Sequence, residues 1–429
     1  ITPTVLGGDI YVGRNWNRNA STGFFIHNNR AVFFNSAANS TITANGDGQY
    51  FPYLYLTKSA LSNTLSLLDN IRIGKEFGIT TGTFDPATKD ATLLSNDTTQ
   101  ASFGKVGAQA DVAYSGTGRF IVERYIKTGT APGQHLKSWQ LLAVPTNGGQ
   151  TVNAAWQEGA TFANQNLVPG YGTQITSNIA PIQPLFDALT TPASGPSMKT
   201  FNPAGTGSWV GIANTTTLPL YNPKGYMIFV RGDRSVTTFS GAGSTPVPTN
   251  LRSRGKLFVP GSNPPPSTTV LAGKFESIGN PYASTIDFLN ITKPAAPAVD
   301  DVFYVWDPLL PGANSLNLGG YQTISLANSY WPSPGGTTNY PSGVPFTKIQ
   351  SGQAFLVHST SGGGTVSFTE NAKSSGYNDV FRIPVSQQSS HFLRTVLYDA
   401  SGRLMDEVVV AFNNRYSNQY DASDALKMI

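Results

Sequence analysis

The run Gly225-Tyr226-Met227-Ile228-Phe229-Val230 consists almost entirely of strand-forming residues. It is short, it follows the turn residues Asn222-Pro223, and it is rich in aromatic and branched side chains, a combination that predicts a strand buried on both faces. A second run, Gly352-Gln353-Ala354-Phe355-Leu356-Val357, also begins with glycine and ends with valine. We expect the two runs to be equivalent core strands of two related units.

Each run is preceded by a second landmark that ends in proline. Trp139-Gln140-Leu141-Leu142-Ala143-Val144-Pro145 precedes Gly225, and Phe275-Glu276-Ser277-Ile278-Gly279-Asn280-Pro281 precedes Gly352 by a similar distance along the chain. Two paired landmarks at similar spacing indicate an internal duplication. Chance is the alternative, because any all-β chain offers many short apolar runs that end in proline.

Composition favours an extracellular, all-β protein. The chain has 429 residues, enough for two to four domains with sizeable cores. Only 12% of the residues are charged, about half the usual share, whereas the 44 Gly, 18 Tyr and 24 Phe are typical of β proteins with polar, uncharged surfaces.

Several classes of partner and site are excluded by the same numbers. A net charge of +4 with scattered Lys and Arg forms no basic patch, so nucleic acid is not an expected partner. The absence of cysteine excludes disulfides and thiolate metal sites. No apolar run approaches the roughly 20 residues of a membrane span. Because the first residue is Ile1 and no signal peptide follows, we expect a processed or excised part of a longer precursor.

Residues 1–97 carry a repeat that predicts a short parallel β-solenoid. Short apolar runs recur there at nearly equal intervals, centred on Ile10, Val32, Leu54, Ile71 and Leu93, and only the step from Leu54 to Ile71 is shorter than the others. A period of about twenty residues, with Asn and Gly at the corners, is typical of rungs that cover one another's apolar faces. A meander of antiparallel hairpins with similar spacing is the alternative.

The rest of the chain is expected to form tandem β-sandwich units with a jelly-roll-like arrangement. The predicted boundaries are 98–260 for the first unit, 268–378 for a related second unit, and 379–429 for a partial third unit that leads to a missing C-terminal region. Between the first two lies a proline-rich linker or edge crossing. Residues 194–207 and 240–248 are rich in Gly, Pro and Ser and are expected to be surface loops.

A strand predicted from Phe120 to Ile126 places Glu123 and Arg124 on opposite faces. Because a covered charge must be paired, each of these side chains is expected to have its own partner.

Several motifs resemble those of large secreted surface proteins of Bacteroidetes, which are typically exported by type IX secretion. In addition to the landmarks quoted above, they are Val122-Glu123-Arg124-Tyr125-Ile126, Pro169-Gly170-Tyr171-Gly172-Thr173, Leu251-Arg252-Ser253-Arg254-Gly255, Ile278-Gly279-Asn280-Pro281-Tyr282 and Val305-Trp306-Asp307-Pro308. The tail from Asp406 to Lys427 is similar to the segment that precedes the cleaved C-terminal sorting domain. The resemblance implies an extracellular or outer-surface location, the type IX machinery as a partner, and no catalytic residues.

Catalytic and metal motifs are absent from the sequence. The four histidines, His27, His135, His358 and His391, are widely separated along the chain and are expected to be structural or on the surface. No Gly-x-Ser-x-Gly elbow, Walker loop or Gly-x-Gly-x-x-Gly motif occurs. We therefore expect no catalytic residue, no cofactor and no metal ligand.

Carboxylates keep a hydrolase open as a rival hypothesis. Glu123, Glu158, Asp187 and Asp307 lie near aromatic residues, but sequence spacing does not give the separation that a glycosidase pair requires. Asp300-Asp301 and Asp406-Glu407 alternate across strands, so we expect solvated turns or calcium-stabilised loops there.

Three surface features are candidate sites. Asp97-Thr98-Thr99 resembles the O-glycosylation acceptor pattern of these bacteria, with Thr98 as the acceptor; an Asx turn made by Asp97 is the alternative. Arg231-Gly232-Asp233 spells a receptor-binding tripeptide that could occupy a hairpin tip, although a turn after the preceding strand explains it as well. Tyr330, Trp331 and Tyr340 lie in a predicted loop and are candidate aromatic contacts for a glycan.

The sequence thus predicts a non-catalytic extracellular or cell-surface protein with a structural or adhesive role. Its first rung near Ile10 and its strand Val408–Phe412 lack neighbours, so we expect the rest of the precursor, a second copy or another complementing strand as partner, with a filament as one possible assembly. Closure of both ends within one chain, by an atypical first rung and a tail that folds back, is the alternative. The alternative is a carbohydrate-binding accessory region of a larger polysaccharide-degrading enzyme, with surface glycans as ligands.

Overall fold

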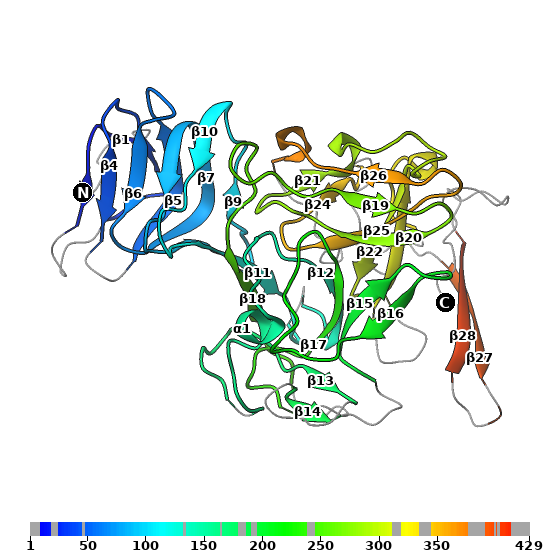
Figure 1. Ribbon diagram of the computed structural model, residues 1–429. Helices are drawn as coiled ribbons and strands as arrows, with labels where there is room; N and C mark the ends of the chain where they lie inside the picture. The colour runs from blue at the N-terminus through cyan, green and yellow to red at the C-terminus, as the bar shows by residue number, and fades with distance from the viewer. Residues whose placement is uncertain are drawn as a thin grey trace.

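The computed structural model describes residues 9–18, 25–44, 48–131, 134–163, 165–178, 186–189, 195–237, 245–310, 319–333, 345–375, 391–398, 400 and 404–412. Figure 1 shows a parallel solenoid at the N-terminal end of the molecule, followed by antiparallel sheets, which confirms the predicted fold class. Helical structure within these ranges is limited to one short helix and three 3₁₀ turns: α1 (Val152–Trp156), η1 (Phe288–Asn290), η2 (Leu326–Asn328) and η3 (Glu370–Ala372). None of the described helices is long and apolar enough to cross a membrane.

The solenoid belongs to one twelve-stranded sheet in which every pair but one is parallel. Its strands are β1 (Ile10–Val12), β2 (Trp16–Asn17), β3 (Ala31–Phe34), β4 (Ser40–Thr43), β5 (Gln49–Thr57), β6 (Thr64–Leu67), β7 (Ile71–Asp85), β8 (Ala91–Leu93), β9 (Ser102–Phe103), β10 (Gln109–Val112), β11 (Phe120–Ile126) and β18 (Thr249–Gly255).

The register confirms the first two steps of the repeat and corrects the last two, since Leu93 pairs with Ile73 rather than with Ile71. Ile10 pairs with Val32, and Val32 pairs with Leu54, as their equal spacing predicts. Leu54 then pairs with Phe77 rather than with Ile71. The reason is the length of β7, whose 15 residues pair first with the start of β5 and then with its middle. The antiparallel meander is therefore wrong.

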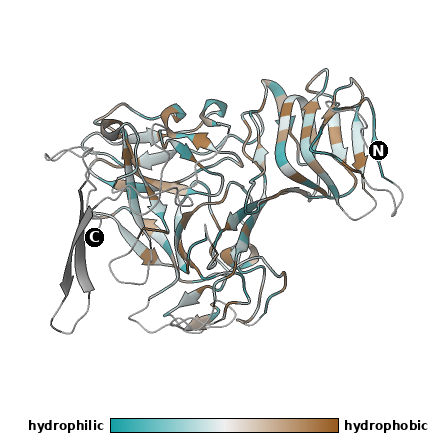
Figure 2. Cartoon of the chain, turned by 180° about the vertical axis from the view of Figure 1, so that it is seen from behind, coloured by the Kyte–Doolittle hydropathy of each residue, from teal (hydrophilic) through white to brown (hydrophobic). Residues whose placement is uncertain are grey.

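Every second side chain of the solenoid strands points inward, and these side chains fill the solenoid interior. Val32, Leu54 and Phe77 point inward and are completely buried, whereas Ile10 of the first rung is partly buried. Figure 2 shows the resulting apolar and polar bands along these strands. Each fully buried aliphatic or aromatic side chain contributes about 1.5–3 kcal/mol, so stacked rungs supply a core without disulfides.

The solenoid sheet continues past residue 97. β9 and β10 pair with β7, and β11 pairs with β8, so the chain adds strands to the last rung after the loop at Asn96. Phe120 and Val122 of β11 complete the buried core, together with Leu257 and Val259 from beyond β18. A terminal rung exposes apolar surface unless something covers it, and here the following segments cover it.

The two related units each contribute one antiparallel sheet. The first has the order β12-β17-β15-β16 and the second the order β20-β25-β22-β23, so both follow the same path along the chain. Their bounds are β12 (Ser138–Leu142), β15 (Met198–Asn202), β16 (Ser208–Gly211), β17 (Tyr226–Val230), β20 (Phe275–Gly279), β22 (Val302–Asp307), β23 (Gly320–Ser325) and β25 (Ala354–His358). The paired landmarks of the sequence thus correspond to a repeated topology.

The sandwich forms between the units rather than within each of them. Tyr226 and Ile228 of β17 face a core of the first unit, where Trp156 of α1 covers them. Met227, on the opposite face, packs against the second sheet. The second sheet also has a different core on each of its faces. Phe355 lies in the core of the second unit, and Leu356 lies with Met227 in the core between the two sheets, which we call the shared core.

One predicted loop contains a strand. Residues 194–207 include β15, which pairs with β17 and β16 despite the surrounding Gly, Pro and Ser. Pairing with a central strand has overridden local composition there.

The remaining strands form short two-stranded sheets: β13 (Thr176–Ser177) with β14 (Ala188–Leu189), β19 (Thr268–Val270) with β26 (Gly364–Val366), β21 (Ile286–Asp287) with β24 (Lys348–Ile349), and β27 (His391–Tyr398) with β28 (Leu404–Phe412). The last hairpin is what the structure describes of the predicted third unit. It lies at the end of the molecule opposite the solenoid (Figure 1).

Candidate functional site on the outer face of the solenoid

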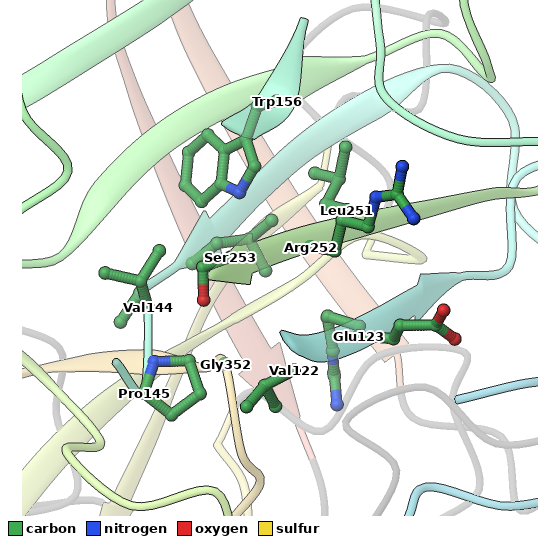
Figure 3. A pocket seen from close by; sticks show the side chains of 12 residues that line it. Val122, Glu123, Val144, Pro145, Trp156, Leu251, Arg252, Ser253 and Gly352 are labelled. Atoms are coloured by element: carbon green, nitrogen blue, oxygen red, sulfur yellow. The ribbon is translucent and has the colours of Figure 1, made fainter. Parts of the chain in front are cut away.

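A cluster of buried charged groups occupies the junction of the solenoid and the first unit. The Glu123 carboxylate on β11 accepts hydrogen bonds from the Ser95 backbone N–H (3.0 Å) and from the Tyr171 hydroxyl (2.9 Å). Arg252 lies opposite Glu123 on β18 (Figure 3) and binds both oxygens of Glu158, at 2.6 Å for the closest contact. Burial raises the pKa of both glutamates.

The cavity beside this cluster is too small for a substrate. It has a volume of about 10 Å³, about what one water molecule needs, and Glu123, Arg252 and Trp156 are among the residues that line it (Figure 3). Glycosidase carboxylates need room for a sugar between them.

Arg124, on the other face of β11, binds Gln100 and Gln350, so the expectation of separate partners for Glu123 and Arg124 is confirmed.

The other two candidate carboxylates are also bound within the fold. Asp187 pairs with the fully buried Arg234 (2.7 Å) and accepts hydrogen bonds from the Gln157 side chain and the Ile175 backbone N–H, both at 2.7 Å. Asp307 is completely buried in the second sheet and accepts a hydrogen bond from the Leu309 backbone N–H (2.9 Å). Of the four candidates, the structure brings Glu123 and Glu158 together around Arg252.

The histidines do not converge. His135 is buried beside Ser138, and burial lowers its pKa to about 4. His358 binds Asp300 (2.7 Å), and His27 packs against Tyr50 with ring centroids 4.9 Å apart. His391 lies at the start of β27. Within the described ranges, no three His, Asp or Glu side chains are grouped as metal ligands.

Asp300 and Asp301 precede β22 and are not part of a strand, so their predicted alternation across a strand is wrong. Asp300 binds His358, whereas Asp301 pairs with Lys293. Asp406 and Glu407 are successive residues of β28.

Arg231-Gly232-Asp233 is not an exposed tip. Arg231 and Asp233 are 5% and 7% exposed, and Arg231 packs over the Phe229 ring. Asp233 accepts hydrogen bonds from the Gly170 and Ser235 backbone N–H groups. Gly232 has a φ of +136°, which favours glycine. The tripeptide forms a buried turn, so its placement at an exposed hairpin tip is wrong and the turn after the preceding strand is confirmed.

Thr98 lies on an exposed loop, but the turn there differs from the predicted one. Asn96, not Asp97, makes the Asx turn: its side-chain oxygen accepts hydrogen bonds from the backbone N–H groups of Thr98 and Thr99, each at 2.9 Å. Asp97 instead faces Lys127 at 3.7 Å. Glycosylation of Thr98 stays a prediction.

The predicted aromatic loop is less exposed than expected. Tyr330 is half-buried against the core of the second unit, and Trp331 is also half-buried. Tyr340 lies outside the described residues. Glycan contact by Tyr330 and Trp331 therefore stays a prediction.

A different group of aromatic side chains lies on the outside of the solenoid. Tyr11, Phe33 and Tyr55 occupy equivalent positions on β1, β3 and β5 and stack on one another, with ring centroids 5.0 and 4.9 Å apart and planes inclined by 13° and 19°. Tyr53 stands beside Tyr55 (6.5 Å, 11°). We call these four residues the aromatic face.

Glycine shapes the end of the aromatic face nearest the sandwich. On β7 the position in register with Tyr55 is Gly78, and a Cβ atom there would lie 2.6 Å from Cδ1 of the Tyr55 ring. Only glycine leaves that space. At the other end, Tyr11 is 63% exposed. The stack of rings thus ends at Gly78, which adds no ring of its own, and its other end, at Tyr11, is exposed to solvent.

Charged groups of both signs border the aromatic face. Lys75 lies over the Tyr53 ring at 5.3 Å, and Glu76 is hydrogen-bonded to Tyr55. Burial, with Glu76 as the next cause, raises the Tyr55 pKa to about 12. Asp9 accepts a hydrogen bond from the Ala31 backbone N–H and is a further negative charge near Tyr55.

Sequence reasoning missed the aromatic face, although a signal was present. Tyr11, Phe33 and Tyr55 are separated by the same steps as the inward residues Ile10, Val32 and Leu54, each of which they directly follow. Because alternate residues of a strand point to opposite faces, an aromatic residue directly after each inward position predicts an outward stack.

A family model described as "Domain of unknown function (DUF8693)" matches residues 188–425, more than half of the chain. No curated protein and no solved structure matches the chain.

Proposed function

The chain belongs to the family described as domain of unknown function DUF8693, and we propose that it is a non-catalytic protein of the extracellular space or outer cell surface, with a structural and adhesive role. The observation that carries the proposal is the aromatic face. Aromatic side chains contribute much of the binding energy of protein surfaces. Here four of them are aligned on the outside of a solenoid instead of being buried in its core.

Rigid attachment of the solenoid to the sandwich supports this role. The Phe103 backbone N–H donates to the Ala283 carbonyl (2.6 Å), and Ala283 belongs to the solenoid core. Lys373 of the second unit donates to the Gly104 carbonyl (3.0 Å). Because these contacts fix the solenoid to the sandwich, the outer face of the solenoid keeps a constant position relative to the rest of the protein, which suits attachment to a surface.

The state of the carboxylates supports a non-catalytic role. General acids and bases must reach a substrate. Glu123 and Asp187 are 3% and 6% exposed, and each is hydrogen-bonded within the protein. Hydrolysis is therefore the less favoured hypothesis.

Three further proposals extend this function. Among the described strands, β1 pairs with β3 alone, and such an open edge can accept a strand from a second copy or from another protein. Export by the type IX machinery and O-glycosylation at Thr98 rest on the sequence resemblance and remain proposals with it.

The test uses the full chain, fluorescently labelled, with intact cells and cell-free matrix material. We expect saturable binding, measured by depletion from solution, and we expect Glu123→Gln to bind equally well because Gln keeps the acceptor for Ser95. Turnover of a glycan or peptide by the chain, lost in Glu123→Gln while the fold is kept, would contradict the proposal.

A further inference from the structure

We propose that the aromatic face binds an extended, uncharged polysaccharide that runs parallel to the solenoid axis. This inference rests on the proposed function and names the ligand of the adhesive surface.

The spacing of the stacked rings leaves part of each ring face open. Centroids in the column Tyr11–Phe33–Tyr55 are 5.0 and 4.9 Å apart, whereas parallel rings in contact are separated by about 3.5–4.0 Å between their planes. Rings in contact at these centroid distances are offset-stacked, and offset stacking leaves a strip of each ring face uncovered. Sugar rings carry C–H groups on their faces, and these groups pack on aromatic faces.

The shape of the face indicates a linear ligand. The column crosses three successive rungs, and Tyr53 widens it by one ring beside Tyr55. A compact monosaccharide would contact one ring, whereas an extended chain could contact every rung. A second protein is a poorer fit, because stable interfaces bury about 800 Å² per partner and all of these rings except Tyr11 are already half-covered.

The polar groups around the face indicate an uncharged ligand that forms hydrogen bonds. Lys75 is matched by Glu76, and Asp9 also lies near Tyr55, so charges of both signs border the rings and neither an acidic nor a basic polymer is favoured. Tyrosine combines an apolar ring with a hydroxyl that can bond to sugar hydroxyls.

The experiment measures retention of the full chain on insoluble β-1,4-linked glucan and on β-1,4-linked N-acetylglucosamine polymer, with short soluble oligosaccharides of both as competitors. The test protein is a double variant that carries both Tyr11→Ala and Tyr53→Ala, two substitutions on the aromatic face. Tyr221→Ala is the matched control, because Tyr221 is 54% exposed and lies outside the solenoid. Thermal unfolding establishes that each variant is folded.

We expect saturable binding to at least one polymer, weakened about tenfold or more in the double variant and unchanged in Tyr221→Ala. Tyr11→Trp, which enlarges the open ring, should tighten binding. Equal binding by the wild type and the double variant would overturn the inference. Attachment to cells without binding to either polymer would also overturn the inference, but it would leave the proposed function standing. A concentration-dependent dimer that is lost in the double variant would overturn the inference as well.

Discussion

Gly225 and Ala354 meet where the two antiparallel sheets cross, and a Cβ atom on Gly225 would lie 2.7 Å from the Cβ atom of Ala354. A second close approach joins Gly279 to Ala143, with a corresponding distance of 2.6 Å. The isolated bridges Leu142↔Gln353 and Lys224↔Ile278 join the two units beside these contacts. The close approach of the two sheets thus depends on a glycine of each unit, Gly225 and Gly279.

Gly225→Ala should destabilise the protein by about 1–3 kcal/mol, because the shared core has no space for the added methyl group. The matched control is Gly13→Ala, whose Cβ would have no neighbour within 4 Å. Urea denaturation of both variants measures the difference. Equal midpoints for the two would contradict close packing at this crossing.

Phe355→Ala should cost about 3–5 kcal/mol through lost burial and a cavity, because Phe355 is completely buried in the core of the second unit. Phe229→Ala should cost clearly less, since Phe229 is half-buried at the edge of the shared core beside Trp139. The two variants are compared by chemical denaturation. A larger loss for Phe229 would mean that the shared core, not the cores of the units, dominates stability.

Asp187→Ala should cost about 3–5 kcal/mol, because it leaves the fully buried Arg234 charge without its partner. Asp97→Ala, which removes an exposed pair with Lys127, should cost about 0–1 kcal/mol. Thermal unfolding of both variants provides the comparison. A neutral effect of Asp187→Ala would show that water or another group satisfies Arg234.

Lys373 should make stability rise with pH in the alkaline range. The residue is 3% exposed, its amine lies 3.0 Å from Glu370, and burial lowers its pKa to about 8. The ordinary lysine pKa is about 10.4, so between these values the unfolded chain binds more protons and stability increases with pH.

The gain from pH 8 to pH 10, relative to Lys373→Met, should be on the order of 1–3 kcal/mol. It is measured as the difference in the free energy of unfolding between the two proteins at each pH. Parallel curves for the wild type and Lys373→Met would show that the amine is not held in an unfavourable environment.

Much of the fold was predictable, because its strongest determinants are periodic. The register of Ile10, Val32 and Leu54 follows directly from their spacing. The landmark strands β12, β17, β20 and β25 follow from apolar runs bounded by turn residues. The length of β7 was not predictable, since its 15 residues contain Gly74, Gly78 and Gly82, which read as breaks in a strand.

The candidate site was less predictable, because exposure depends on packing between distant segments. Arg231-Gly232-Asp233 has the composition of a surface turn, yet contacts with residues such as Gly170 bury it. Tyr330 lies in a loop-like sequence, yet it packs on the second core. Glu123 and Glu158 meet only because Arg252, which is distant from both in the sequence, lies between them.

The most direct test of the claim that the chain acts by attachment outside the cell is its location on the cells that produce it. Antibodies against the folded chain are applied to intact and to permeabilised cells, and external protease is added to a parallel sample. The proposed function predicts labelling of intact cells, or protein in the medium, and loss of the surface signal after protease. Labelling only after permeabilisation, with full protection from protease, would contradict it.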